Sequence, residues 1–205
     1  MKKTNKKIKE MDVVFLLDRS GSMSGIEQDT IGGYNSYLEK QRKNKMNTKI
    51  TTVLFDDKYE LLHYRKDIKD VNNITEEDYY VRGCTALLDA IGKTITKLER
   101  ETKDNKVLFV ITTDGLENAS SEYTKEKIKK LIESHSNWEF IYIGANIDSY
   151  SEGATLGINR KNIANYSKSK TGTKELFNSI GKLSEYMCCE RAIDESWKKE
   201  LESTK

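Results

Sequence analysis

The chain has 205 residues, of which 36% are hydrophobic and 33% are charged, so it is long enough to bury the core of one globular domain. Its formal net charge is only +2, and its basic and acidic residues are interleaved, which excludes the one-sided basic surface of a nucleic-acid-binding protein. No run approaches the roughly 20 apolar residues of a membrane span, and the run at 13–17 is too short for a signal peptide, so we expect a cytoplasmic protein.

Four continuous apolar runs predict buried strands. In chain order they lie at 13–17, 50–55, 107–111 and 140–144. Runs without alternation are typical of strands that are covered on both faces, as in a parallel sheet. Apolar residues at helical spacing between the runs predict crossover helices. The expected fold class is therefore α/β, with a doubly wound, mostly parallel central sheet and helices on both faces.

Two weaker segments complete the predicted sheet. Residues 59–64 follow the second strand after a gap too short for a helix, which predicts one antiparallel edge strand. A last strand is expected near 162–166. Before the 140–144 strand, Ser120 or Ser121 is the expected cap of a helix.

The domain organisation follows from these elements. Residues 1–10 form a basic N-terminal extension, and residues 11–188 form one domain that closes with a long helix. Residues 189–205 are expected to continue this helix and to overhang the domain. Trp197 and Leu201 then become candidate contacts to a partner, although core packing is their simpler interpretation.

Cysteine chemistry contributes little to the prediction. Cys84, Cys188 and Cys189 form no C-x-x-C pair, so a zinc site is not expected. Buried free thiols in a reducing compartment are the simplest interpretation.

Polar side chains gather where three predicted segments reach one edge of the sheet. Asp18 directly follows the first strand in the stretch D-R-S-G-S, which also contains Ser20 and Ser22. Asp114 follows the third long strand, and Thr85 stands just before a predicted helix. Because ligands bind at the carboxyl ends of the strands in an open α/β sheet, we expect these five side chains to converge.

All five of these side chains offer hard oxygen atoms. Two carboxylates and three hydroxyls suit Mg²⁺, whereas Zn²⁺ prefers imidazole and thiolate ligands. The two carboxylates would balance the charge of the ion, and one outward position would be left for water. A carboxylate from a partner could replace that water. Mn²⁺ and Ca²⁺ remain open alternatives to Mg²⁺.

The same residues resemble the metal-ion-dependent adhesion site (MIDAS) of the von Willebrand factor type A (vWA) domain. That family combines D-x-S-x-S, a threonine and a D-G turn in this order, and here these are Asp18, Ser20, Ser22, Thr85 and Asp114. The resemblance covers roughly residues 11–167 and is strongest to small stand-alone bacterial and phage members. It implies a Rossmann-like sheet and a module that binds an Asp or Glu of a protein ligand through the metal, without catalysis. The charge pattern and the short apolar runs lead us to expect neither nucleic acid nor a membrane as a partner.

Two other classes of function remain open. A metal-dependent phosphoryl-transfer or hydrolytic enzyme would need a second acid where Ser20 stands, and neither His63 nor His135 is placed to act as a base. Cys84 likewise lacks a base and is expected to be a buried structural thiol. The other alternative is an assembly component that uses its C-terminal helix, and the oligomeric state is not predicted.

Residues that flank the candidate site receive weaker expectations. Asp89 is expected to be a solvated or supporting acid rather than a metal ligand. Arg19 and Arg82 are expected to be surface charges, with steering of an acidic partner as the alternative. Glu117 and Asn118 follow the D-G turn and are expected to shape the rim or to contact the ligand.

Overall fold

The structure is a computed structural model that describes residues 10–44, 47–103 and 105–204. One six-stranded sheet forms its centre, in the order β3-β2-β1-β4-β5-β6. The strands are β1 (Met11–Asp18), β2 (Thr48–Phe55), β3 (Tyr59–Asp67), β4 (Lys106–Thr113), β5 (Trp138–Ala145) and β6 (Ile163–Tyr166). All neighbours are parallel except β3, which pairs antiparallel with β2 at the edge.

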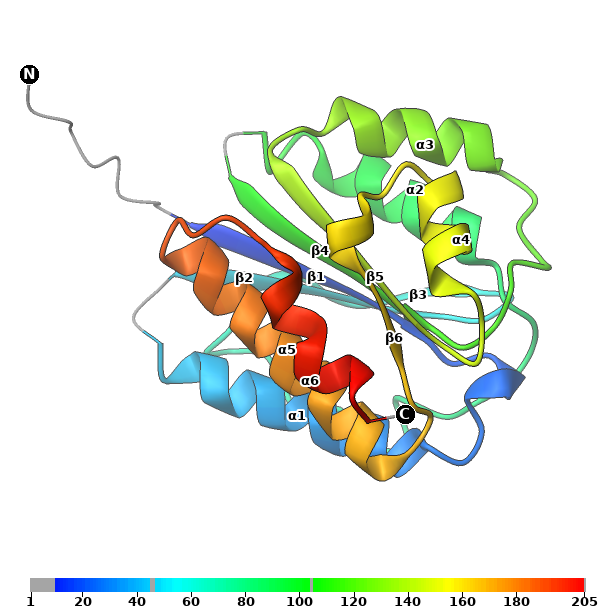
Figure 1. Cartoon of the computed structure of the whole chain (residues 1–205), viewed down its shortest axis with the longest axis horizontal. Coiled ribbons are helices and arrows are strands. Elements are labelled where there is room, and N and C mark those ends of the chain that lie inside the picture. The colour runs from blue at the N-terminus through cyan, green and yellow to red at the C-terminus, as the bar shows by residue number, and fades with distance from the viewer. Residues whose placement is uncertain (1–9, 45–46, 104, 205) are drawn as a thin grey trace, which may run out of the picture.

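Helices cover both faces of the sheet (Figure 1). They are α1 (Glu27–Arg42), α2 (Leu87–Leu98), α3 (Lys125–Ser134), α4 (Ser149–Thr155), α5 (Lys170–Cys188) and α6 (Lys199–Glu202). In Figure 1, α1, α5 and α6 lie on one side of the strands, and α2, α3 and α4 lie on the other. The predicted doubly wound α/β fold with one antiparallel edge strand is therefore confirmed.

Strand β1 shows why the apolar runs are continuous. Val13, Phe15 and Leu17 belong to the core cluster beneath α1 and α5, whereas Val14 and Leu16 belong to the cluster beneath α2 and α3. Successive side chains of a strand point to opposite faces, so a strand that is covered on both sides needs apolar residues at every position. Among the described residues, no helix is both long and apolar enough to cross a bilayer.

The C-terminal segment differs from the expectation of an overhanging helix. Helix α5 ends at Cys188, and the chain then turns back to place Trp197 and Leu201 in the core, each 0% exposed. The Nε1 of Trp197 donates to the carbonyl oxygen of Lys161 at 2.9 Å. The interpretation of Trp197 and Leu201 as partner contacts is therefore wrong, and their simpler interpretation as core residues is correct.

The cysteine expectation was also wrong in part. Cys84 and Cys189 are exposed, and Cys188 is only partly buried. Cys84 lies in the irregular segment that precedes α2, next to the buried Thr85.

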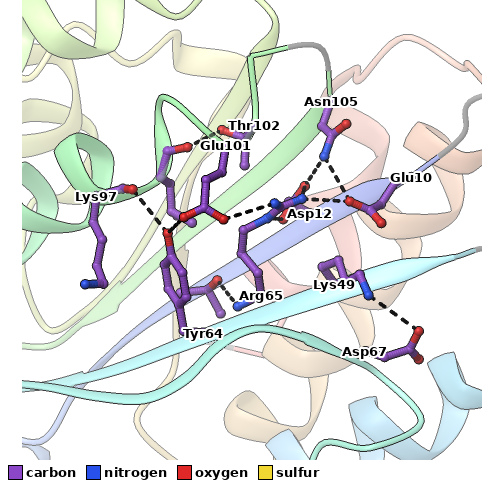
Figure 2. A network of polar contacts seen from close by, with 12 residues as sticks. Glu10, Asp12, Lys49, Tyr64, Arg65, Asp67, Lys97, Glu101, Thr102 and Asn105 are labelled. Atoms are coloured by element: carbon purple, nitrogen blue, oxygen red, sulfur yellow. Dashed lines mark hydrogen bonds and ion pairs between the residues drawn. The ribbon is translucent and has the colours of Figure 1, made fainter.

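The two ends of the sheet carry different polar chemistry. At the start of β1, Asp12 is buried and accepts from Arg65 Nε at 2.7 Å and from Asn105 Nδ2 at 2.7 Å. Figure 2 shows the Arg65 side chain between Asp12 and Glu101, with Glu10 nearby. The charge of Asp12 is thus neutralised within the protein. The opposite end, where the parallel strands terminate, contains the candidate site.

Candidate metal centre

Asp18 is the last residue of β1 and is fully buried. Its Oδ1 accepts from the backbone N–H of Ser20 at 2.7 Å, and its Oδ2 accepts from the hydroxyl of Thr113 at 2.6 Å. Burial raises the pKa of Asp18 to about 6. The hydrogen bonds from Thr113 and Ser20 lower the pKa in part, and the nearby Asp114 adds a smaller upward shift. Asp18 is thus a buried acid that is mostly ionised at neutral pH.

Ser20 and Ser22 come from the turn that follows β1. This turn includes the short 3-10 helix η1 (Gly21–Met23), and the two hydroxyl oxygens lie 3.0 Å apart. Ser20 is buried and Ser22 is exposed, so the pair spans the distance from the interior to the surface. The N–H of Gly21 donates to the carbonyl oxygen of Gly83 at 3.2 Å, which ties this turn to the segment that contains Thr85.

The hydroxyls of Thr85, Ser20 and Ser22 surround Gly115. A Cβ atom placed on Gly115 would lie 2.8 Å from Thr85 Oγ1, 3.1 Å from Ser22 Oγ and 3.7 Å from Ser20 Oγ. Gly115 directly follows Asp114, so the hydroxyl oxygens converge beside that acid. We call Asp18, Ser20, Ser22, Thr85 and Asp114 the oxygen cage.

Asp114 has one satisfied and one unsatisfied carboxylate oxygen. Its side chain is 2% exposed, and its Oδ2 lies 3.0 Å from the Nζ of Lys168. Its Oδ1 is buried and has no hydrogen-bond partner among the described residues. Buried polar atoms without a partner are uncommon in folded proteins, and a bound ion or water is one explanation for such an atom. This oxygen therefore suits a metal ligand.

Asn118 and Glu117 hold the loop after Asp114 against helix α2. The N–H of Thr85 donates to Asn118 Oδ1 at 2.9 Å, and the N–H of Asn118 donates back to the carbonyl oxygen of Thr85 at 3.0 Å. Glu117 Oε2 accepts from the N–H of Leu88 at 2.9 Å. The expectation that Glu117 and Asn118 shape the rim is confirmed by these contacts.

Asp89 supports the same loop from α2. Its carboxylate accepts from the backbone N–H groups of Ser121, Glu122 and Tyr123 at 2.9–3.0 Å. Burial alone would raise the pKa of Asp89, but these three donors outweigh it and lower the pKa below its usual value. Asp89 is thus a supporting acid, as expected, and its oxygens are used within the protein.

Arg19 does not behave as the predicted surface charge, whereas Arg82 is partly exposed, with 33% of its side chain accessible. Arg19 is 0% exposed, and it donates through Nε to Asp56 Oδ2 at 2.9 Å and through Nη2 to Glu60 Oε2 at 2.6 Å. Arg82 donates to the same Asp56 oxygen at 2.7 Å. Burial alone would raise the pKa of Asp56. The two arginines and the N–H of Lys58 lower it by more, so the pKa of Asp56 lies below its usual value. Arg19 is therefore a buried ion-pair residue rather than a surface or steering charge.

Three further residues contact the oxygen cage that sequence reasoning did not identify. Thr113 donates to Asp18, and Tyr79 donates through its hydroxyl to the carbonyl oxygen of Asp18 at 2.6 Å. Lys168 contacts Asp114 and also donates to the carbonyl oxygen of Ser22. Lys168 lies between β6 and α5, so its position after a parallel strand was the available signal.

The residues present fit a hard divalent cation. Two carboxylates and three hydroxyls face one region, and no imidazole or thiolate belongs to the set. His63 pairs with Thr52 within the sheet, and His135 follows the last residue of α3, so neither histidine joins the cage. A small cation held here would satisfy Asp114 Oδ1 and offset the repulsion between Asp18 and Asp114.

No family model matches the chain, and no curated protein sequence matches it either. Solved structures do match. Proximal thread matrix protein 1 from the mussel byssus aligns with a TM-score of 0.62 and 18% identity over 85% of this chain. A von Willebrand factor type A structure from Catenulispora acidiphila aligns with a TM-score of 0.62 and 13% identity over 84% of this chain. The chain has the von Willebrand factor type A fold.

A third vWA-like match is the manganese-loaded Plasmodium vivax TRAP protein, with a TM-score of 0.64 and 17% identity over 88% of this chain and 74% of that chain. The present vWA fold spans only 46% of the byssus protein and 42% of the Catenulispora chain. One structure of the byssus protein has a zinc-occupied MIDAS motif. Two of these neighbours were thus solved with a divalent metal.

Proposed function

We propose that this chain is a metal-dependent protein-binding module and not an enzyme. Ser20, Ser22 and Thr85 hold Mg²⁺ through their hydroxyls, and Asp18 and Asp114 balance its charge, in part through water. The observation that carries the proposal is the convergence of three hydroxyls around Gly115, next to the unsatisfied Oδ1 of Asp114. The byssus structure with a zinc-occupied MIDAS motif supports a divalent cation at this place, and the manganese-loaded Plasmodium vivax protein is a second metal-bound neighbour.

The surface around the oxygen cage supports a protein ligand. Among the residues that the structure describes, Tyr80 and Leu116 are the exposed large hydrophobic side chains, at 44% and 55%. Leu116 follows Gly115. Tyr80 accepts a hydrogen bond from the side chain of Arg82 at 2.9 Å, and the N–H of Arg82 donates to the carbonyl oxygen of Arg19, the first residue after β1. The side chains of Tyr80 and Leu116 are both available for apolar contact with a ligand. We infer that the partner presents an Asp or Glu flanked by apolar residues.

Calorimetry with Mg²⁺ tests the metal site. Asp18→Asn removes one carboxylate charge with little change in shape, and we expect it to weaken Mg²⁺ binding by about tenfold or more. Asp12→Asn is the matched control, because Asp12 is also a buried acid of β1 but lies at the opposite end of the strand. The control should leave Mg²⁺ affinity within about twofold of wild type. Equal affinities for wild type and Asp18→Asn would refute the metal site.

Selection of displayed random peptides tests the partner chemistry. Peptides would be captured on the full chain in Mg²⁺ and released with a chelator. We expect each group of similar released peptides to need one Asp or Glu for its capture. Changing that residue to Asn or Gln should abolish capture, because a neutral amide is a much weaker metal ligand than a carboxylate. Release of peptides that bind equally well after this change would contradict an acidic partner.

The enzyme alternative gains no support from the geometry. The hydroxyl of Ser20 lies next to Ser22 rather than next to a base, and Ser20 stands where a phosphatase of the relevant class needs a second acid. We therefore expect no turnover of a phosphate monoester above buffer when Mg²⁺ is present.

A further inference from the structure

Lys168 reaches the oxygen cage from outside the three segments that form it. Its Nζ lies 3.0 Å from Asp114 Oδ2 and donates to the carbonyl oxygen of Ser22. Both contacts are made to segments of the cage itself. The ammonium group therefore bridges the turn after β1 and the turn after β4.

The burial of this ion pair makes it more than a surface contact. The side chain of Lys168 is 20% exposed and that of Asp114 is 2% exposed. Exposed ion pairs contribute little, but a charge-assisted hydrogen bond to a buried carboxylate acts in a medium of lower dielectric constant and is screened less by salt. Without it, Asp114 would be a buried charge whose two oxygens both lack a partner.

Charge balance relates Lys168 to the metal. Asp18 and Asp114 together carry up to two negative charges, and one ammonium group balances half of that. A divalent cation that binds both acids supplies the whole balance, and the ammonium group beside it would then experience repulsion. A positive charge within a few ångströms of a second positive charge is unfavourable by an amount that grows with burial.

We propose that Lys168 is the built-in counter-ion of the oxygen cage and competes with the divalent cation for Asp114. This inference rests on the proposed metal site. A cation at Oδ1 of Asp114 would place a second positive charge beside the ammonium group at Oδ2, so metal binding favours an arrangement in which the Lys168 side chain leaves Asp114. An interaction that holds Lys168 away from Asp114 therefore raises the affinity for the metal. By thermodynamic linkage, the bound metal strengthens that interaction by the same factor.

Lys168→Met tests the competition, because it removes the charge and keeps an unbranched chain. In calorimetry on the full chain, we expect this variant to bind Mg²⁺ about tenfold more tightly than wild type. Lys170→Met is the matched control, because Lys170 is exposed at the start of α5 and its substitution removes the same charge nearby. The control should change the affinity by less than about twofold.

Thermal unfolding in a chelator gives a second measurement that needs no metal. Lys168→Met should lower the metal-free melting temperature by several degrees, because Asp114 loses its counter-ion, and Lys170→Met should not.

If wild type binds Mg²⁺ and Lys168→Met binds it equally or more weakly, the competition is refuted while the metal site stands. If neither protein binds Mg²⁺, the metal site fails and the competition fails with it. An unchanged metal-free melting temperature in Lys168→Met would also overturn the role of Lys168 as counter-ion.

Discussion

Asp18 shows how a binding site can lower the stability of the metal-free protein. Burial raises its pKa from the ordinary value of 3.8 to about 6. The folded chain therefore binds this proton more tightly than the unfolded chain does. The stabilisation that the proton provides is complete below the unfolded pKa and is lost as the pH rises through the folded pKa.

This difference gives a pH prediction for the protein in a chelator. Between about pH 4.5 and about pH 7.5, the free energy of unfolding of wild type should fall by about 2 kcal/mol relative to that of Asp18→Asn. Urea unfolding of both proteins at several pH values measures this difference. A gap between the two proteins that stays constant with pH would show that Asp18 is not a desolvated, titrating acid.

Substitution of Gly115 tests the convergence of the cage by placing a methyl group against its hydroxyls. An alanine Cβ there would lie 2.8 Å from Thr85 Oγ1, closer than real Cβ atoms approach an oxygen, so the hydroxyls must separate. We expect Gly115→Ala to weaken Mg²⁺ binding by about tenfold or more in calorimetry. Gly32→Ala is the control, because a Cβ on Gly32 meets nothing within 4 Å. Tight Mg²⁺ binding by Gly115→Ala would mean that the three hydroxyls do not act together.

At the scale of elements, Asp89 explains why the predicted cap of α3 was wrong. Ser120 or Ser121 was the expected cap, yet α3 begins at Lys125 and Thr124 caps it, with its side chain accepting from the N–H of Lys127. The N–H groups of residues 121–123 are bound by Asp89 instead. A capping serine and a serine in a loop look alike in sequence, because the acid that selects between them lies more than 30 residues away.

This arrangement predicts an unequal cost for two substitutions. Asp89→Ala leaves three backbone N–H groups without their acceptor and should lower the free energy of unfolding by about 2–3 kcal/mol. Thr124→Ala removes one cap and should cost about 1 kcal/mol. Urea unfolding compares the two variants, and an equal or smaller cost for Asp89→Ala would contradict its role as the anchor of the loop.

At the scale of the whole molecule, the C-terminal segment completes the core. Trp197 is fully buried, and Lys198 Nζ donates to the carbonyl oxygen of Ile163 in β6 at 2.8 Å. Glu202 accepts from the N–H of Asn165 in the same strand at 3.2 Å. The segment therefore covers the β6 edge of the sheet, which would otherwise expose unpaired backbone groups.

Trp197→Ala tests this role of the segment. We expect it to lower the free energy of unfolding by about 3–5 kcal/mol, because it removes a large side chain from a packed interior. Denaturant unfolding measures the loss, and sedimentation of the folded fraction should show the mass of wild type. A stable Trp197→Ala variant with a lower oligomeric mass would instead restore the idea of a partner contact.

The sequence predicted most of the fold and the positions of the five cage residues, because strand ends in a parallel sheet meet at one edge. It could not place Lys168 or Tyr79, whose contacts depend on how the segments after β6 and β3 cross the rim. It also misjudged Arg19, since an arginine next to a strand end looks exposed until Asp56 and Glu60 are seen to enclose it. Local patterns indicate the elements, whereas these ion pairs depend on distant residues.

The proposed function depends above all on five oxygen-bearing residues that hold one hard cation. An anomalous-difference map from crystals of the full chain grown with Mn²⁺ examines this cage directly. We predict one strong peak that is bonded to the hydroxyl oxygens of Ser20, Ser22 and Thr85, with Lys168 moved away from Asp114. Saturating Mn²⁺ that gives no peak there, or a peak only elsewhere on the chain, would show that the five residues do not form a metal site.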